Sequence, residues 1–309
     1  MGQTDNKIRT NLLPPKKDVP FIVMLLPALI IVLIFSYLQM IGILVAFKDY
    51  APRKGIFGSP WAASGGFQNF IDIVKTPGMP KSIWNTFYLS ILSLCINFPA
   101  PVIFALLLEE VRSRVFKSTV QTISYLPYFL SWAAVTGMGL SLLSQYGIIN
   151  DIIVKLGGER TIFLGDGKYF LPVYLIINVW KTVGWNSIVY LSAISGISQD
   201  LYEAARIDGA GRFKQVINIT LPELVPTMMI LLIMNLGAVF GSNFELVYGL
   251  QNDIAWNTEV ISTVVYKYGI KEGAYGLSTA LGLMQGVVSL ILTLLANKLS
   301  DKISNVSMW

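Results

Sequence analysis

The amino-acid sequence predicts an all-α integral membrane protein with six transmembrane helices. Of its 309 residues, 54% are hydrophobic and only 13% are charged, and its mean hydropathy is +0.60. A soluble domain carries about 25% charged residues, so this balance is typical of a protein that exposes much of its surface to lipid. The segment 19–47 contains no charge at all, and it is long enough to cross a hydrocarbon core of about 30 Å.

Six apolar segments of this kind follow one another along the chain. We expect kinks at the prolines within 97–101 of the second span and at Pro127 of the third, because a proline removes a backbone donor. The predicted spans are 19–47, 86–108, 118–150, 169–194, 224–244 and 274–297. The transmembrane domain then occupies 19–297, between a tail of residues 1–18 and a tail of residues 298–309.

Basic residues indicate which loops lie in the cytosol. Arg112, Arg114 and Lys117 crowd the short turn between the second and third spans, and the N-terminal tail is also basic. Because short cytosolic loops carry an excess of lysine and arginine, both tails and this turn are expected inside the cell. The loops 48–85, 151–168 and 245–273 are then expected outside. The polar start of the chain shows no pattern of a cleavable signal.

The polar stretch 198–222, between the fourth and fifth spans, is predicted to form a helix, a turn and a second helix. Asp200 can cap the first helix, and Glu203, three residues later, can complete a capping box with it. Gly209 can take the positive φ that ends a helix. Pro222 is expected to stop the second helix and to suit the first turn of the next span.

This stretch resembles the EAA loop of the permease subunits of binding-protein-dependent ABC importers, within the oligosaccharide and polysaccharide (maltose-type, type I) branch. The resemblance rests on residues at fixed spacing. They are Glu203, Ala204, Ala205, Gly209, Ile219, Leu221 and Pro222, with Asp208 in the same context. An alternative interpretation is an amphipathic helix pair at the membrane surface, in which Glu203 only caps a helix.

The resemblance implies that the loop docks into a cleft of a separate ATPase subunit. Glu203 would meet a basic group there, and Gly209 would allow the turn between the two helices. The implied assembly contains a second homologous permease, two ATPase subunits and an external substrate-binding protein, which would contact the loops outside. ATP and Mg would be bound by the ATPases and no cofactor by this chain, which would span the bacterial cell membrane.

Several kinds of chemistry lack their residues in this sequence. No phosphate-binding loop of the pattern GxxxxGK[ST] occurs, and the absence of histidine removes the commonest metal ligand and proton carrier. No metal site and no enzymatic activity are therefore expected. An ion-coupled carrier or membrane enzyme would place acidic or histidine clusters within its spans, so that alternative is weakly supported. The modest net charge of +5 requires no nucleic acid.

Polar and aromatic side chains at mid-membrane depth are the candidates for a substrate path. Burial in lipid would be costly, so they are expected to face the bundle interior or a wet cavity. Amides and ammonium groups bind hydroxyls and aromatic rings cover sugar C–H faces, so the predicted substrate is a carbohydrate, specifically an oligosaccharide. The candidates are Trp132, Asn178, Trp180, Lys181, Trp185, Asn186, Asn243 and Gln285, with Phe129 and Asn235 in support.

Two alternatives remain open for these residues and for the substrate. The amides could instead join helices by hydrogen bonds, and the tryptophans could serve packing alone. An importer for another small solute, such as glycerol phosphate, would share the loop motif, but would be expected to place more basic residues along its path than Lys181 alone.

Overall fold

The computed structural model describes residues 18–165, 167–241, 243–251 and 258–304. Helices dominate this part of the chain and no strand occurs in it, although an isolated antiparallel bridge joins Lys48 to Trp61. The predicted all-helical fold is confirmed.

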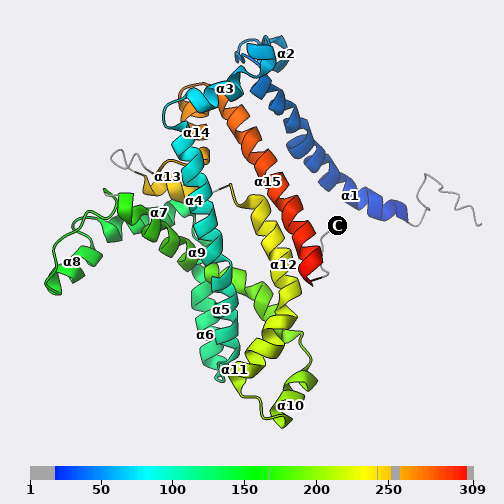
Figure 1. Ribbon diagram of the computed structural model, residues 1–309, viewed down its shortest axis with the longest axis vertical. Helices are drawn as coiled ribbons and strands as arrows, with labels where there is room; N and C mark the ends of the chain where they lie inside the picture. The colour runs from blue at the N-terminus through cyan, green and yellow to red at the C-terminus, as the bar shows by residue number, and fades with distance from the viewer. Residues whose placement is uncertain (1–17, 166, 242, 252–257, 305–309) are drawn as a thin grey trace, which may run out of the picture.

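Long helices stand side by side in a bundle (Figure 1). Among them α9 packs against α4, α5 and α12, and α15 packs against α12. Two short helices, α2 (Gly55–Gly58) and α3 (Gln68–Lys75), lie at one end, and α10 (Gln199–Ile207) lies at the opposite end. The bundle helices are α4 (Met79–Asn97), α5 (Pro99–Glu109), α9 (Gly167–Ser195), α12 (Leu221–Ala238) and α15 (Tyr275–Ser304).

Four described helical segments are long and apolar enough to cross a membrane, namely Val19–Phe47, Met79–Glu109, Arg212–Ala238 and Tyr275–Lys302. A bent helix pair makes a fifth if it counts as one span. The fourth expected span corresponds to α9, which has 29 residues but is not among these segments. The count of six spans therefore stays a prediction.

The third expected span is sharply broken rather than gently bent. The segment Arg114–Phe129, made of α6 (Arg114–Tyr125) and the turn η5 (Leu126–Phe129), meets the helices that follow it at 102°. Pro127 offers no N–H, Leu130 is extended, and the hydroxyl of Ser131 accepts the Ala134 N–H to start α7 (Trp132–Leu143). One proline and a new N-cap together end one helix and begin another.

Three further boundaries differ from the prediction. The second span begins at Met79 rather than at residue 86, and although Pro99 interrupts its hydrogen bonds, Phe98 keeps a helical φ of −78°. The sixth helix runs on to Ser304, so the expected boundary at 297 lies inside it. In the loop 151–168, α8 (Ile148–Lys155) continues the helical path.

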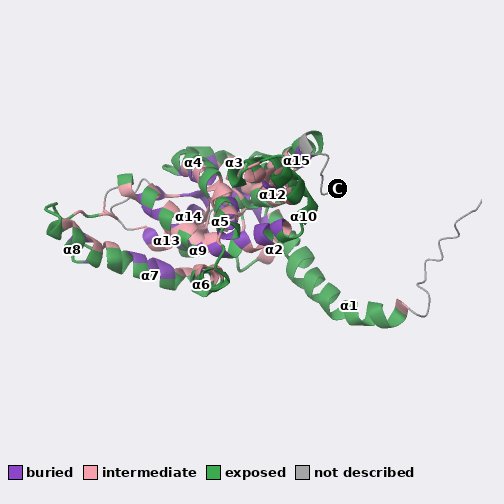
Figure 2. Cartoon of the chain, turned by 90° about the horizontal axis from the view of Figure 1, so that it is seen from below, coloured by how far each residue is buried: buried purple, intermediate pink, exposed green. Residues whose placement is uncertain are grey.

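The first span lies apart from the bundle along most of its length (Figures 1 and 2). It consists of α1 (Val19–Val32), the π-helical turn η2 (Leu33–Tyr37) and η3 (Leu38–Phe47). α1 and η2 bury no residue, whereas the end of η3 packs on α15 and buries Val45 and Ala46. An exposed apolar helix of this kind is stable where lipid tails replace water around it.

Three apolar clusters hold the bundle together. One joins α4, α9, α13 (Phe244–Leu250) and the residues before α14 (Ile261–Tyr266), and a second joins η3, α3, α14 and α15. A third lies nearest α10 and joins α5, α9 and α12 through Ala105, Tyr190 and Leu224. α6 approaches α9 so closely that a Cβ on Gly184 would lie 2.1 Å from the carbonyl oxygen of Ser124.

Candidate functional site: a coupling loop and a polar cavity

The loop 198–222 contains α10, a turn and the start of a second helix, α11 (Arg212–Gln215). Ser198, not Asp200, caps α10, because its hydroxyl accepts the Asp200 N–H at 3.3 Å. The predicted capping box between Asp200 and Glu203 is therefore wrong. Asp200 lies inside the first helical turn, where a carboxylate is stabilised by the positive end of the helix dipole.

Gly209 makes the turn that follows α10. Its φ is +78°, a conformation that disfavours residues with a Cβ. The Ala210 N–H donates to the Ala205 carbonyl at 2.8 Å, and the Gly209 N–H donates to the Arg206 carbonyl at 3.1 Å. This pair of hydrogen bonds is a Schellman motif, which ends the helix and reverses the chain.

The second helix does not stop at Pro222. α11 (Arg212–Gln215) passes through a π-helical turn, η6 (Val216–Thr220), into α12, and together they form one helical segment of 27 residues. Pro222 occupies the first turn after η6, where the widened backbone tolerates a residue that lacks an N–H. The loop is thus continuous with a membrane span, so a displacement of one is passed to the other.

The outer face of the loop is open for a partner. α10 buries none of its residues; Glu203, Ala204, Asp208 and Gly209 are exposed, while Ala205, Ile219 and Leu221 are half-buried. Two large apolar side chains also face outward, Ile207 at 86% exposure and Phe213 at 77%. Sequence reasoning did not single out Ile207 as an exposed apolar residue of the loop. An isoleucine within an otherwise polar loop was the available signal.

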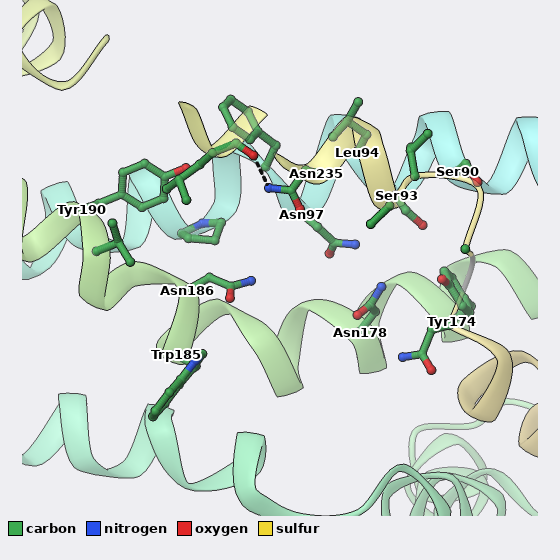
Figure 3. A pocket seen from close by; sticks show the side chains of 18 residues that line it. Ser90, Ser93, Leu94, Asn97, Tyr174, Asn178, Trp185, Asn186, Tyr190 and Asn235 are labelled. Atoms are coloured by element: carbon green, nitrogen blue, oxygen red, sulfur yellow. Dashed lines mark hydrogen bonds between the residues drawn. The ribbon is translucent and has the colours of Figure 1, made fainter. Parts of the chain in front are cut away.

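A polar cavity of about 310 Å³ is lined by residues of α4, α5, α9 and α12 (Figure 3). Asparagine amides from three of these helices line it, with serines from α4 and aromatic rings from α9. No charged side chain is among its lining residues. The polar and aromatic residues that line it are Ser90, Ser93, Asn97, Phe98, Tyr174, Asn178, Trp185, Asn186, Tyr190, Asn235 and Asn243.

Half of the predicted path residues meet in this cavity. Asn178, Trp185, Asn186 and Asn243 line it, and the supporting Asn235 does as well, with its amide donating to the Leu231 carbonyl at 2.7 Å. Trp132, Trp180, Lys181 and Gln285 lie elsewhere, outside its lining.

Sequence reasoning missed the contribution of α4 to the cavity. The hydroxyl of Ser90 and the amide oxygen of Asn97 are buried without a hydrogen-bond partner among the described residues. Ser90, Ser93 and Asn97 recur at steps of three and four along an apolar helix, and that spacing places them on one face. Unpartnered acceptors on a cavity wall are suited to bind a ligand that carries hydroxyl groups.

Lys181 supports the break in the third span. Its ammonium group donates to the carbonyls of Tyr128 and Leu130 at 2.7 Å each and of Pro127 at 3.3 Å. It also lies 4.8 Å from the ring centre of Trp132, and the residue is only 4% exposed. The cation thereby donates to the carbonyls around the break, of which that of Pro127 also accepts from the Leu130 N–H. Its contacts place Lys181 and Trp132 at a structural junction.

Gln285 lies on an apolar groove between α4 and α15. This groove has a volume of about 410 Å³ and is lined by rings such as Trp84 and Phe87. Gln285 therefore belongs to a different surface from the asparagines.

A family model described as the inner membrane component of binding-protein-dependent transport systems matches residues 78–305, which include the cavity and the loop. The chain belongs to this family. It is an inner-membrane permease subunit of an ABC importer, and such permeases work with a second permease, with ATPase subunits and with a substrate-binding protein.

Relatives and solved structures agree along almost the whole chain. The polygalacturonan/rhamnogalacturonan transport system permease protein YteP of Bacillus subtilis is 43% identical, over 90% of this chain and 87% of its own length. The protein LplB of the same organism is 41% identical, over 93% and 90%. A chain from a bacterial ABC transporter that imports the acidic polysaccharide alginate matches with a TM-score of 0.86 and 38% identity, over 94% of this permease and 97% of that chain.

Proposed function

We propose that this permease forms part of the path of a carbohydrate, specifically an oligosaccharide, and that partner ATPases drive it through the loop 198–222. The observation that supports this best is the continuity of Arg212–Ala238, which begins in the exposed loop and carries Asn235 on the cavity wall. A rigid helix of this kind transmits a displacement at its docked end to the cavity.

The chemistry of the cavity fits a sugar. Amide groups of Asn178, Asn186 and Asn243 donate to and accept from hydroxyls, and the ring of Trp185 offers a flat apolar face. Amide N–H groups also donate to carboxylates, so the same lining accommodates a uronic acid. The second permease is assigned the opposite side of the path.

The relatives support a carbohydrate as the substrate class. YteP is named for polygalacturonan and rhamnogalacturonan, and the AraP permease of Bacillus subtilis, 26% identical, is named for arabinooligosaccharides. The UgpA permease of Yersinia pseudotuberculosis, named for glycerol 3-phosphate, is 28% identical. A phosphate dianion favours cationic ligands, and the cavity lining contains none. The carbohydrate is therefore preferred.

We assign the hydrolysis of ATP with Mg to the partner ATPases and no catalytic residue to this chain. Both termini are placed in the cytosol, with the loop 198–222 facing the ATPases and the lobe of α2 and α3 facing outside. The opposite positions of α10 and α2 along the bundle fit this orientation. Glu203, Ala204, Ala205, Asp208 and Gly209 are assigned to the docking surface, with Ile207 and Phe213 as its apolar anchors.

The test is ATP-dependent uptake by the assembled importer in proteoliposomes. The double variant Glu203→Lys, Gly209→Pro should abolish uptake, because it reverses a docking charge and removes the turn, while capture of sugar by the external binding protein continues. Gly282→Ala is the control, since Gly282 lies in α15 outside the loop and no atom lies within 4 Å of its added Cβ. Unimpaired uptake by the double variant would overturn the proposal.

A further inference from the structure

An ion pair joins the coupling loop to the turn after α5. The Nη1 atom of Arg212 lies 2.8 Å from Oε2 of Glu110, although the two residues are 102 positions apart in sequence. Both residues line a second cavity, of about 640 Å³, between the loop and the segment 109–112. Because this space separates the two segments, the ion pair bridges them where apolar packing is incomplete.

Neither charge is placed where its own helix would favour it. Glu110 is the C-cap of α5, next to the negative end of the helix dipole, and Arg212 is the first residue of α11, next to a positive end. Each charge alone weakens its helix slightly. Contact between the two offsets both penalties, so the location of each residue is explained by the other.

The two helices that the ion pair connects are both walls of the polar cavity. α5 runs from Glu110 back to Pro101 and Phe98, which line the cavity. The segment Arg212–Ala238 runs from the ion pair to Asn235, which also lines the cavity. The ion pair therefore joins two helices near the coupling loop, and both helices line the cavity further along their length.

We propose that Glu110 and Arg212 are positioning residues that make α5 and α12 move together when the coupling loop is displaced. The apolar cluster already joins α5, α9 and α12; without the ion pair, the end of α5 next to the loop would follow the loop less fully, and the cavity would respond incompletely to each ATPase cycle. This inference rests on the proposed function, since it assigns a role to residues that lie between the ATPase and the cavity.

The test measures the ratio of sugar imported to ATP hydrolysed by the complete importer in proteoliposomes. Glu110→Arg and Arg212→Glu should each lower this ratio by roughly three- to fivefold, because an exposed ion pair stabilises only modestly. The double variant that carries both changes should restore the ratio, since it remakes the pair with reversed charges. A structural role alone would change the amount of assembled complex but not the ratio.

A neighbouring ion pair provides the matched control. Lys117 lies 2.7 Å from Glu109, and neither residue forms an ion pair with the coupling loop. Glu109→Lys and Lys117→Glu should leave the ratio unchanged.

Three results would overturn the inference. They are normal ratios in both single variants at positions 110 and 212, an unrestored or unassembled charge-swapped double variant, and an equal loss in the control pair. The Glu203→Lys, Gly209→Pro variant in the same assay reports on the proposed function separately. If that variant transports normally the proposed function fails, whereas normal coupling at 110 and 212 overturns only the role of the ion pair.

Discussion

The ammonium of Lys181 donates a 2.7 Å hydrogen bond to the carbonyl of Tyr128, and through that residue it supports the cavity wall. The Tyr128 ring stacks on Trp185 with centroids 4.5 Å apart and planes 6° from parallel, and Trp185 lines the polar cavity. The broken third span, the buried cation and the cavity wall are thus one packed unit.

Replacement of Lys181 should therefore act through stability. Lys181→Met removes the ammonium donor of the Tyr128 and Leu130 carbonyls, at a cost of about 2 kcal/mol or more. The expected result is a lower thermal midpoint of the purified importer together with reduced uptake. Lys181→Arg keeps the charge and serves as the control. A Met variant as stable as the wild type would contradict this role.

The crossing of α6 and α9 depends on the absence of a side chain at Gly184. Gly184→Ala should destabilise the protein by about 1–3 kcal/mol, because the new Cβ meets the backbone oxygen of Ser124. Gly282→Ala is the matched control, since no atom lies within 4 Å of its added Cβ, and it should be neutral or slightly stabilising. The thermal unfolding midpoints of the two variants in detergent test this. Equal midpoints for Gly184→Ala and Gly282→Ala would contradict the close crossing.

The asparagines of the cavity should determine uptake at low sugar concentration. Asn186→Leu removes a hydrogen-bonding group of similar size, and we expect uptake to fall by about tenfold, the factor that corresponds to about 1.4 kcal/mol. Trp180→Phe changes a residue on the same helix outside the cavity lining and should transport normally. The account of the cavity fails if Asn186→Leu keeps wild-type uptake across sugar concentrations.

The cap of α10 should be Ser198 in solution. Ser198→Ala removes the acceptor for the Asp200 N–H, so amide hydrogen exchange in α10 should accelerate by roughly fivefold, as expected for a cap that contributes about 1 kcal/mol. Asp200→Ala should have a smaller effect, because its carboxylate acts only on the helix dipole. The reverse order of the two effects would favour the cap that the sequence predicted.

The sequence predicted those features that depend on a local rule. Long uncharged runs are stable in lipid, so the apolar spans could be predicted from composition. The turn at Gly209 could be predicted because only glycine readily adopts a φ of +78°. The asparagines of α9 and α12 were predicted to face a wet interior, because an amide is costly in lipid. These inferences needed no knowledge of which helices are neighbours.

Features that depend on distant contacts could not be predicted. Pro222 was expected to stop a helix. The helix instead continues through it, because the π-helical turn before it tolerates a residue that lacks an N–H. Lys181 looked like a substrate ligand because its carbonyl partners lie more than 50 positions away, at a break set by Pro127. Gln285 was grouped with the polar candidates for the substrate path, but in the structure it lines the apolar groove between α4 and α15.

The central claim is that this chain forms a path and takes its driving force from other subunits. Uptake by proteoliposomes that contain the two permeases, with and without the ATPase subunits, tests it most directly. The account predicts that sugar accumulates only when the ATPases and ATP are both present. Accumulation against a concentration gradient by the permeases alone, driven by an ion gradient, would contradict it.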